Sequence, residues 1–320
     1  KLGPEKKTKL AEINEELSVL SLQFGENILK ETNRFELVID SEEDLAGLPD
    51  AVVQGATETA TERGHEGKWV FTIHKPSMLP FLQYSERREL REQIFKAYIN
   101  MGNHDDDLDN KKILSRMAAL RVERAHLLGF DSHADYVLEE NMAQQPANVY
   151  KLLRDLWTPA LERARLEAAE MQEVIDSEGG DFQLQSWDWW YYAEKVKKAK
   201  YDIDEEMMRP YFELSNVLNG AYELATRLYG ITFEERTDLP VYHEDVKTYE
   251  VKEADGTHVG ILYTDWYPRA SKRGGAWMGE YRGQSKPEGR MVTPVITNCG
   301  NFSKPTGDKP ALLSLDEVLT

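Results

Sequence analysis

The residues of this chain best suited to metal binding or acid–base chemistry are its seven histidines: His65, His74, His104, His126, His133, His243 and His258. A helical zinc site needs two histidines four residues apart, with a glutamate directly after the first, so that both imidazoles lie on one helix face. His65 and His243 are each followed by glutamate, but neither has a second histidine at that spacing. We therefore predict surface or satisfied core histidines, and no complete metal site within the chain.

The acidic segment "HDDDLDN", residues 104–110, resembles a calcium-binding loop but departs from its pattern at two places. Counted from Asp105, the sixth place needs glycine for a sharp turn, and the twelfth needs a bidentate glutamate. Asn110 and Arg116 occupy those places. A solvated helix N-terminus, where the helix dipole favours acidic residues, is the better interpretation.

The chain has a single cysteine, Cys299, which excludes an internal disulfide framework and a cysteine-based zinc cluster. A nucleophilic role would require a histidine within hydrogen-bond reach. The sequence alone cannot place one, and a lone cysteine on a predicted strand is usually a small buried residue. This cysteine content fits a reducing compartment, but many exported bacterial enzymes also lack disulfides. Cytoplasm and periplasm therefore both stay open.

The segment "WDWWYYAEKV", residues 187–196, holds five aromatic residues within six positions. Aromatic residues that stack on nucleic-acid bases normally come with a basic patch, which is missing here. Core packing or a domain interface is the favoured interpretation, and a carbohydrate-binding platform is an alternative.

The segment "KRGGAWM", residues 272–278, has paired glycines between strand-like segments. Glycines there let another backbone approach closely, either a neighbouring strand or a bound peptide. A simple turn or bulge is the alternative, and the glycines alone favour it.

Charge and hydropathy exclude several classes of partner. The chain of 320 residues has 39 Lys plus Arg against 57 Asp plus Glu, a net charge of −18 and a pI near 4.9. Nucleic-acid binding needs a basic face, so we predict no such partner. No apolar run approaches the roughly 20 residues of a membrane span, so we expect a soluble protein without a membrane partner. The length favours two domains or one large one.

Apolar residues recur at intervals of three and four over much of the first 230 positions, which predicts helices. The predicted helices are 8–32, a short one opened by Ser41, one from Pro49 to about Gly64, 86–101, 108–128 closed by Gly129, 147–178, 187–200, and 215–229 closed by Gly230. Pro159 removes a backbone hydrogen bond and predicts a kink or two stacked helices. The segment 68–74 is the only strand expected in the first two hundred residues.

The pattern changes after residue 230. Alternation on both sides of Asp255 and Gly256 predicts a β-hairpin, and two further short strands are expected within 273–284 and 291–302. Ser314 and Glu317 then form a capping box that opens a terminal helix. We predict a mainly α fold with a small β element, divided into a mostly helical domain, 1–230, and a β region with the start of that helix, 231–320.

Five segments carry a resemblance to a known family: "KLAEINEELSVLSLQFGENIL", "ERAHLLGFDSHADYVLEENMAQQPANVYKLL", "YYAEKVKKAKYDIDEEMMRPYFELSNVLNGAYELATRLYGITFEE", "DWYPRASKRGGAWMGEYRGQ" and "TPVITNCGNFSKPTGDKPALLSLDEVLT". They resemble the thimet oligopeptidase family of zinc peptidases, in order along nearly the whole chain. Within that family the chain is most similar to bacterial peptidyl-dipeptidases. The oligopeptidase A branch shares the glycine-rich and strand segments.

The resemblance implies the N-terminal and central part of a helical ellipsoid split by a deep channel that admits short peptides. In this family a helix like "LLSLDEVLT" continues into HExxH, which supplies two zinc-binding histidines and a general-base glutamate. We expect those residues beyond Thr320, so this chain is expected to be a fragment that has no catalytic residue, binds no zinc and is inactive alone. The full-length protein is expected to be a monomeric zinc peptidase that releases C-terminal dipeptides from short peptides.

The resemblance also implies a substrate-binding role for the segments 272–278 and 293–301, which match the family's small sheet and glycine-rich loop beside the active site. Main-chain pairing with an extended peptide is the expected binding mode. The candidate substrate-binding residues are Gly274, Gly275, Ala276, Trp277 and Asn298.

Two other classes of function stay open from the sequence. A degenerate relative could keep a peptide channel without metal, and would then be a helical peptide-binding protein. The helix content alone would also suit an interaction scaffold. A stoichiometric zinc in the full-length protein would exclude the metal-free binder.

Overall fold

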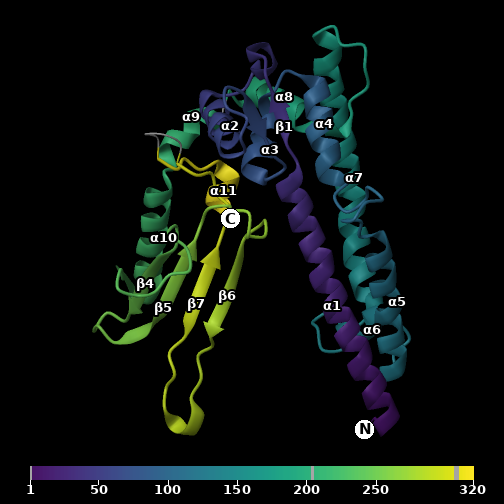
Figure 1. Ribbon diagram of the computed structural model, residues 1–320, viewed down its shortest axis with the longest axis vertical. Helices are drawn as coiled ribbons and strands as arrows, with labels where there is room; N and C mark the ends of the chain where they lie inside the picture. Colours follow the sequence, from purple (N-terminus) through teal and green to yellow (C-terminus); the bar gives the residue numbers. More distant parts are fainter. Residues whose placement is uncertain (1, 203–204, 306–309) are drawn as a thin grey trace. The chain divides into compact units, whose positions relative to one another are not determined.

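The computed structural model describes residues 2–202, 205–305 and 310–320 (Figure 1). The chain forms two compact units, each built from two separate segments. Unit 1 comprises Lys1–Leu37 and Arg88–Val196, and unit 2 comprises Val38–Arg87 and Lys197–Thr320. Unit 2 lies on both sides of residue 230, so the division into 1–230 and 231–320 stays a prediction. What the structure shows near that position is a change from helix to strand.

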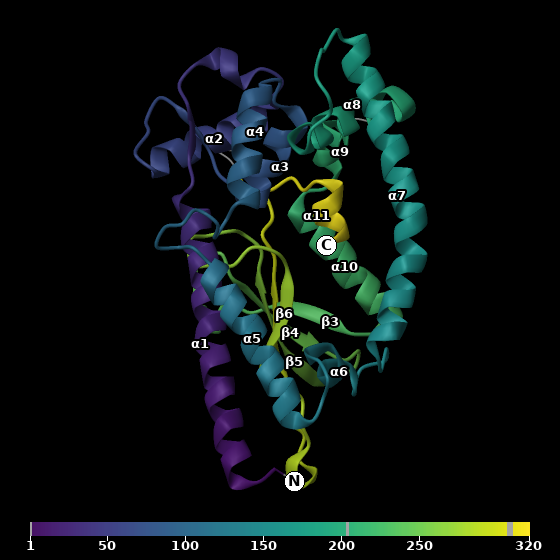
Figure 2. The same cartoon turned by 90° about the vertical axis from the view of Figure 1, so that its right-hand side faces the viewer.

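Unit 1 is built from helices. They are α1 (Pro4–Arg34), α4 (Arg88–Ile99), α5 (Lys111–Leu128), α6 (His133–Leu138), α7 (Pro146–Ser177), the 3₁₀ turn η2 (Ser186–Asp188) and most of α8 (Trp189–Tyr201). The helices α1 and α5 lie side by side (Figure 2), because the apolar stripes of both meet in one core. That core contains Ile13 and Leu17 of α1 together with Ile113, Met117 and Leu120 of α5.

The aromatic segment 187–196 contributes to a second core of unit 1. Tyr192 is buried together with Met171 and Ile175 of α7. The carboxylate of Asp188, which is fully buried, accepts hydrogen bonds from Arg88 and Arg91 of α4. The interpretation of this segment as core packing is therefore confirmed.

The first segment of unit 2 contains two elements that the sequence patterns did not predict. The strand β1 (Leu37–Ile39) pairs with β2 (Trp69–Phe71), so the expectation of a single strand in the first two hundred residues is wrong. A run of three residues is too short to show alternation. Helix α3 (Lys75–Tyr84) was also missed, because Pro80 lies inside it. The 3₁₀ turn η1 (Glu42–Leu45) and α2 (Asp50–Glu62) complete this segment.

The second segment of unit 2 contains a five-stranded sheet in the order β3-β4-β5-β7-β6 (Figure 1). Its strands are β3 (Thr232–Glu235), β4 (Lys247–Lys252), β5 (His258–Asp265), β6 (Trp277–Arg282) and β7 (Val295–Cys299). The pair β5 and β7 is parallel, and the other neighbours are antiparallel. The predicted hairpin is β4 and β5, and Gly256 takes a positive φ of 86° in its turn.

Helix α10 (Leu214–Tyr229) packs on one face of this sheet. Tyr222 stacks on Phe233 of β3 with ring centroids 4.3 Å apart, and meets Tyr249 of β4 edge-on at 5.2 Å. The helix ends at Gly230, whose left-handed φ of 74° suits a glycine C-cap. The short elements α9 (Glu205–Met208) and η3 (Arg209–Tyr211) precede it.

The remaining helix predictions have clear outcomes. Helix α7 continues through Pro159 as one element, so a split into two stacked helices is wrong. Gly129 closes α5 in a left-handed conformation, as predicted. The terminal helix α11 (Leu315–Leu319) begins with the predicted capping box of Ser314 and Glu317. The mainly α fold with a small β element is confirmed. No helix within the described ranges has the length and apolar character needed to cross a membrane.

Candidate functional site

The candidate substrate-binding residues lie on β6, on β7 and in the loop that enters β6. Gly274, Gly275 and Ala276 are exposed in that loop, and Trp277 is the first residue of β6. Asn298 of β7 is the Cα partner of Met278, the second residue of β6. The structure thus brings all five candidates to one end of two neighbouring strands. Their role in substrate binding stays a prediction.

Trp277 and Asn298 project from opposite faces of the sheet. Trp277 pairs with Cys299, and Asn298 is the preceding residue on β7. Successive side chains of a strand point to opposite faces. Asn298 therefore belongs to the face that α10 covers, which it shares with Tyr249 through the register of β4, β5 and β7. Trp277 belongs to the other face.

The two glycines of the loop have different physical roles. Gly275 has a φ of +93°, which non-glycine residues rarely adopt, whereas no such φ is found at Gly274. A Cβ added at either position would meet no atom within 4 Å, so neither glycine is required by packing within the chain. The Asn301 amide holds the loop by donating to the carbonyls of Arg273, at 3.0 Å, and Gly275, at 2.6 Å. The loop is thus a shaped turn with open space beside it.

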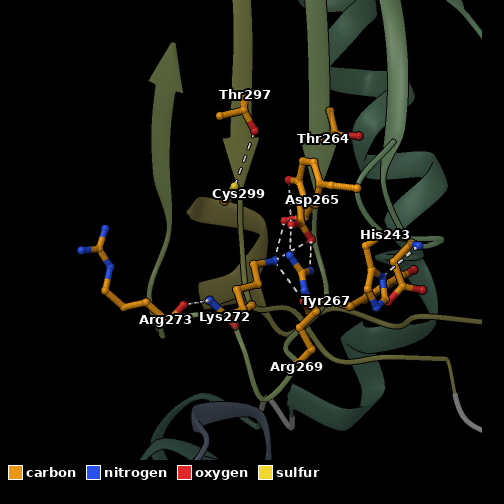
Figure 3. A network of polar contacts seen from close by, with 12 residues as sticks. His243, Thr264, Asp265, Tyr267, Arg269, Lys272, Arg273, Thr297 and Cys299 are labelled. Atoms are coloured by element: carbon orange, nitrogen blue, oxygen red, sulfur yellow. Dashed lines mark hydrogen bonds and ion pairs between the residues drawn. The ribbon is translucent and has the colours of Figure 1, made fainter. Parts of the chain in front are cut away.

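The buried carboxylate of Asp265, at the end of β5, anchors the start of this loop (Figure 3). The Arg269 guanidinium donates to both carboxylate oxygens at 2.8 Å, which is the bidentate geometry that arginine favours. The Lys272 ammonium donates to Oδ1 at 2.9 Å, and the Tyr242 hydroxyl donates to Oδ2 at 2.9 Å. Asp265 itself is 1% exposed.

Lys272 is almost equally buried and ties the loop to β5 a second time. Its ammonium also donates to the backbone carbonyls of Asp265, at 2.7 Å, and Tyr267, at 2.9 Å. An ammonium has three donors, so all of them are used. Lys272 is separated from Gly274 only by Arg273, and the backbone path into the glycines is therefore set by a buried ionic cluster.

The electrostatics of the cluster keep Asp265 ionised. Burial alone would raise the pKa of this carboxyl, but hydrogen bonds from Arg269, Lys272 and Tyr242 outweigh it and lower the pKa to about 2. Burial, followed by the hydrogen bond to Asp265, raises the pKa of the Tyr242 phenol. A carboxylate that is ionised and accepts four side-chain hydrogen bonds is poorly suited to exchange protons. Its role is to position the loop.

The strand β6 lies at an edge of the sheet (Figure 1). Among the residues that the structure describes, no strand pairs with its side away from β7. Met278 and Tyr281 of β6 are 68% and 61% exposed. An edge strand presents backbone N–H and C=O groups that an extended chain can pair with.

Sequence reasoning missed Asp265, Arg269 and Lys272 as members of the site. A charged residue that will be buried looks the same in a sequence as one that will be exposed. The available signal was an aspartate at the end of an apolar strand, followed by two cations within seven residues. Buried carboxylates need such partners.

The histidines and the acidic segment show no metal centre. Within 2–202, 205–305 and 310–320, no group of three or more histidine, cysteine, aspartate or glutamate side chains is arranged to hold a metal ion. His104 lies 2.7 Å from Glu31, and His258 lies 2.9 Å from Glu250. In the segment 104–110, Asp109 is paired with Lys111 at 2.7 Å. The described residues therefore do not form a zinc site.

Cys299 is buried at the end of β7, as predicted for a small apolar residue. Its sulfur lies 3.6 Å from the Thr297 hydroxyl.

A comparison with protein families decides what kind of protein this is. The model of peptidase family M3 matches residues 81–320, three quarters of the chain. The chain belongs to peptidase family M3. This agrees with the resemblance in the sequence, because the matched region includes the glycine-rich loop and the whole five-stranded sheet.

Curated members of family M3 align with nearly the whole chain. Dipeptidyl carboxypeptidase of Escherichia coli is 37% identical over 321 residues, covering 100% of this chain and 47% of the relative. Oligopeptidase A of the same organism is 37% identical over 324 residues, covering 100% and 48%. Saccharolysin of Saccharomyces cerevisiae is 30% identical over 327 residues, covering 98% and 45%. The chain spans less than half the length of each of these relatives.

Proposed function

We propose that this chain is the substrate-cleft portion of a zinc metallopeptidase that hydrolyses short peptides. The observation that carries the proposal is the unpaired edge of β6, entered by a glycine turn that a buried ionic cluster fixes. The membership of family M3 supports the hydrolytic chemistry. The binding geometry rests on the chain's own residues.

An extended peptide would bind by adding a strand beside β6. Main-chain hydrogen bonds give such binding its affinity, and the side chains of the peptide contribute selectivity. The open space beside Gly274 and Gly275 would let the peptide backbone continue past the end of β6. The ordered loop reduces the entropy that binding costs, because the turn is already formed.

We further propose that the full-length protein releases dipeptides from the C-termini of its substrates. The similarity to a dipeptidyl carboxypeptidase supports this specificity. The equal identity to oligopeptidase A makes a cut elsewhere in the peptide the competing outcome. A peptide with an amidated C-terminus distinguishes these two specificities, because an enzyme that releases C-terminal dipeptides requires the free carboxylate of its substrate. Loss of turnover on amidation supports dipeptide release, and unchanged turnover contradicts it.

The zinc of the proposed peptidase is assigned to sequence outside this chain. The residues described in the structure do not form a ligand set, so no catalytic step is derived through the metal. The full-length protein is expected to contain one zinc ion per molecule. Metal analysis that finds none would favour the metal-free peptide-binding protein instead.

The main test of the binding site replaces Gly275 by alanine in the full-length protein. Alanine strains a positive φ at a cost of about 1–2 kcal/mol, so the turn shifts and peptide KM rises. Gly256→Ala is the matched control, because Gly256 has a φ of +86°, equally open space and a place in a different turn. Gly256→Ala is expected to leave KM unchanged; if Gly275→Ala and Gly274→Val also left KM and peptide binding unchanged, the proposed site would be wrong.

A further inference from the structure

Three tyrosines gather on the sheet face opposite α10; Tyr281 belongs to the edge strand β6, whereas Tyr263 belongs to β5, two strands in from that edge. Tyr263 of β5 is the Cα partner of Thr297, and Thr297 is the partner of Gly279 in β6. The neighbouring register, Leu262 with Tyr249, belongs to the face that α10 covers. Because neighbours along a strand alternate, Tyr263 projects from the other face.

The tyrosines contact one another and are held in place. The rings of Tyr263 and Tyr281 meet edge-on, with centroids 5.8 Å apart and planes at 79°. The Tyr263 hydroxyl donates to the carbonyl of Pro240 at 3.1 Å, and the Tyr242 hydroxyl donates to Asp265. Two of the three phenols are thus fixed by hydrogen bonds at the rim of the face.

The cluster is ordered but remains open to solvent. Tyr242 is 50% exposed and Tyr281 is 61% exposed, while Tyr263 is partly buried. A single exposed aromatic residue needs no explanation. Tyr281 is the member on the edge strand, beside which an added strand would project its side chains, and Tyr263 packs against its ring from the inner side of the sheet.

We propose that Tyr281, with Tyr263 packed against its ring, forms a binding subsite for an aromatic or large apolar side chain of a peptide held on β6. The inference rests on the proposed function and names a side-chain preference for that site. Alternate side chains of the added strand project toward this face, and aromatic rings favour the edge-on and offset contacts that the tyrosine rings offer. The preference therefore falls on every second residue of the bound segment.

The test compares peptide substrates of the full-length protein that differ at one position, with Phe, Leu, Ala or Asp. The measured quantity is the ratio of kcat/KM for the Phe peptide to that for the Ala peptide. Tyr281→Ala is expected to lower this ratio by about 2- to 12-fold, the contribution of one aromatic pair. Tyr281→Phe keeps the ring and is expected to keep the ratio. Tyr229→Ala, on α10 and 72% exposed, is the matched control.

The outcomes separate the subsite from the proposed peptide binding. If Tyr281→Ala keeps the Phe-to-Ala ratio while all peptides are still cleaved, the subsite is wrong and the proposed function stands. If backbone N-methylation along the peptide has no effect on KM, strand pairing with β6 is wrong. If the full-length protein cleaves no peptide, the ratio of the dissociation constants of the Ala and Phe peptides, measured at equilibrium, replaces the ratio of kcat/KM values. Circular dichroism checks that each variant is folded.

Discussion

The two edges of the five-stranded sheet, β3 and β6, both carry charge but differ in their other exposed side chains. On β3, Glu234 is paired with Lys252 and Glu235 lies 3.2 Å from Lys247. On β6, Glu280 and Arg282 are exposed as well, and Arg282 donates to the carbonyl of Thr293. Charged side chains hinder an edge from pairing with other chains. The edge at β6 differs in that it also exposes a methionine and a tyrosine, Met278 and Tyr281.

The ion pairs next to the two edges differ in how deeply they are buried. Arg236, directly after β3, pairs with Asp238 and Glu250 at 2.7 Å in contact with solvent. Asp265, at the end of β5, is buried and pairs with Lys272, which is also buried, and with Arg269, whose side chain is 19% exposed. Exposed ion pairs contribute little to stability, whereas breaking a buried pair is costly. The buried ionic cluster thus lies beside the loop that enters β6, and the exposed one follows β3.

The largest expected effect comes from Asp265→Asn. This change leaves the cations of Arg269 and Lys272 buried without their counter-charge, and should lower the free energy of unfolding by about 3 kcal/mol. Urea denaturation followed by circular dichroism measures it. Asp238→Asn, beside the β3 edge, is the matched control and should leave stability nearly unchanged. Equal losses in both variants would remove the contrast between the two loops.

The pH dependence of stability should be the next largest effect. The pKa of Asp265 is lowered to about 2 in the folded protein, against about 3.9 in an unfolded chain. The unfolded state binds the proton more readily, so the contribution of Asp265 is complete above pH 5 and is lost as the pH falls toward 2. The loss is about 2 kcal/mol. Denaturation at several pH values, compared with Asp265→Asn, should show the two curves converging in acid, and parallel curves would contradict the lowered pKa.

The smallest expected effect comes from placing a charge on the open edge. Met278→Lys replaces an exposed apolar side chain of β6 by a charge and should raise the KM of short peptides by about two- to fivefold, the contribution of one cross-strand side-chain pair. Thr232→Lys adds the same charge to β3 and should leave KM unchanged. A shift of KM by Thr232→Lys alone would show that the peptide pairs with the other edge.

Much of the helical fold could be predicted because its signals are local. The apolar stripe of α1, the glycine at Gly129 and the capping box of Ser314 and Glu317 each lie within a few residues of the structure that they specify. The same holds for the turn at Gly256. The strand β1 was not predicted, because its three residues form a strand only through pairing with β2.

Part of the candidate site could be predicted from the sequence and part could not. The glycine pair at Gly274 and Gly275 is visible in the sequence, because glycine has few uses other than unusual backbone conformation and close approach. The cations that hold this turn, Arg269 and Lys272, follow Asp265 within seven residues, but the burial that makes their pairing important is a property of the folded sheet and is not visible in the sequence.

The local pattern of residues therefore specified the helices, their caps and the glycine turn of this protein. Strand order, the open edge at β6 and the burial of Asp265 followed from packing between segments that are distant in the chain. Hydrophobic periodicity and capping act over a few residues, so they can be read directly. The burial of a charge depends on the partners that surround it in space, and those partners come together only in the folded chain.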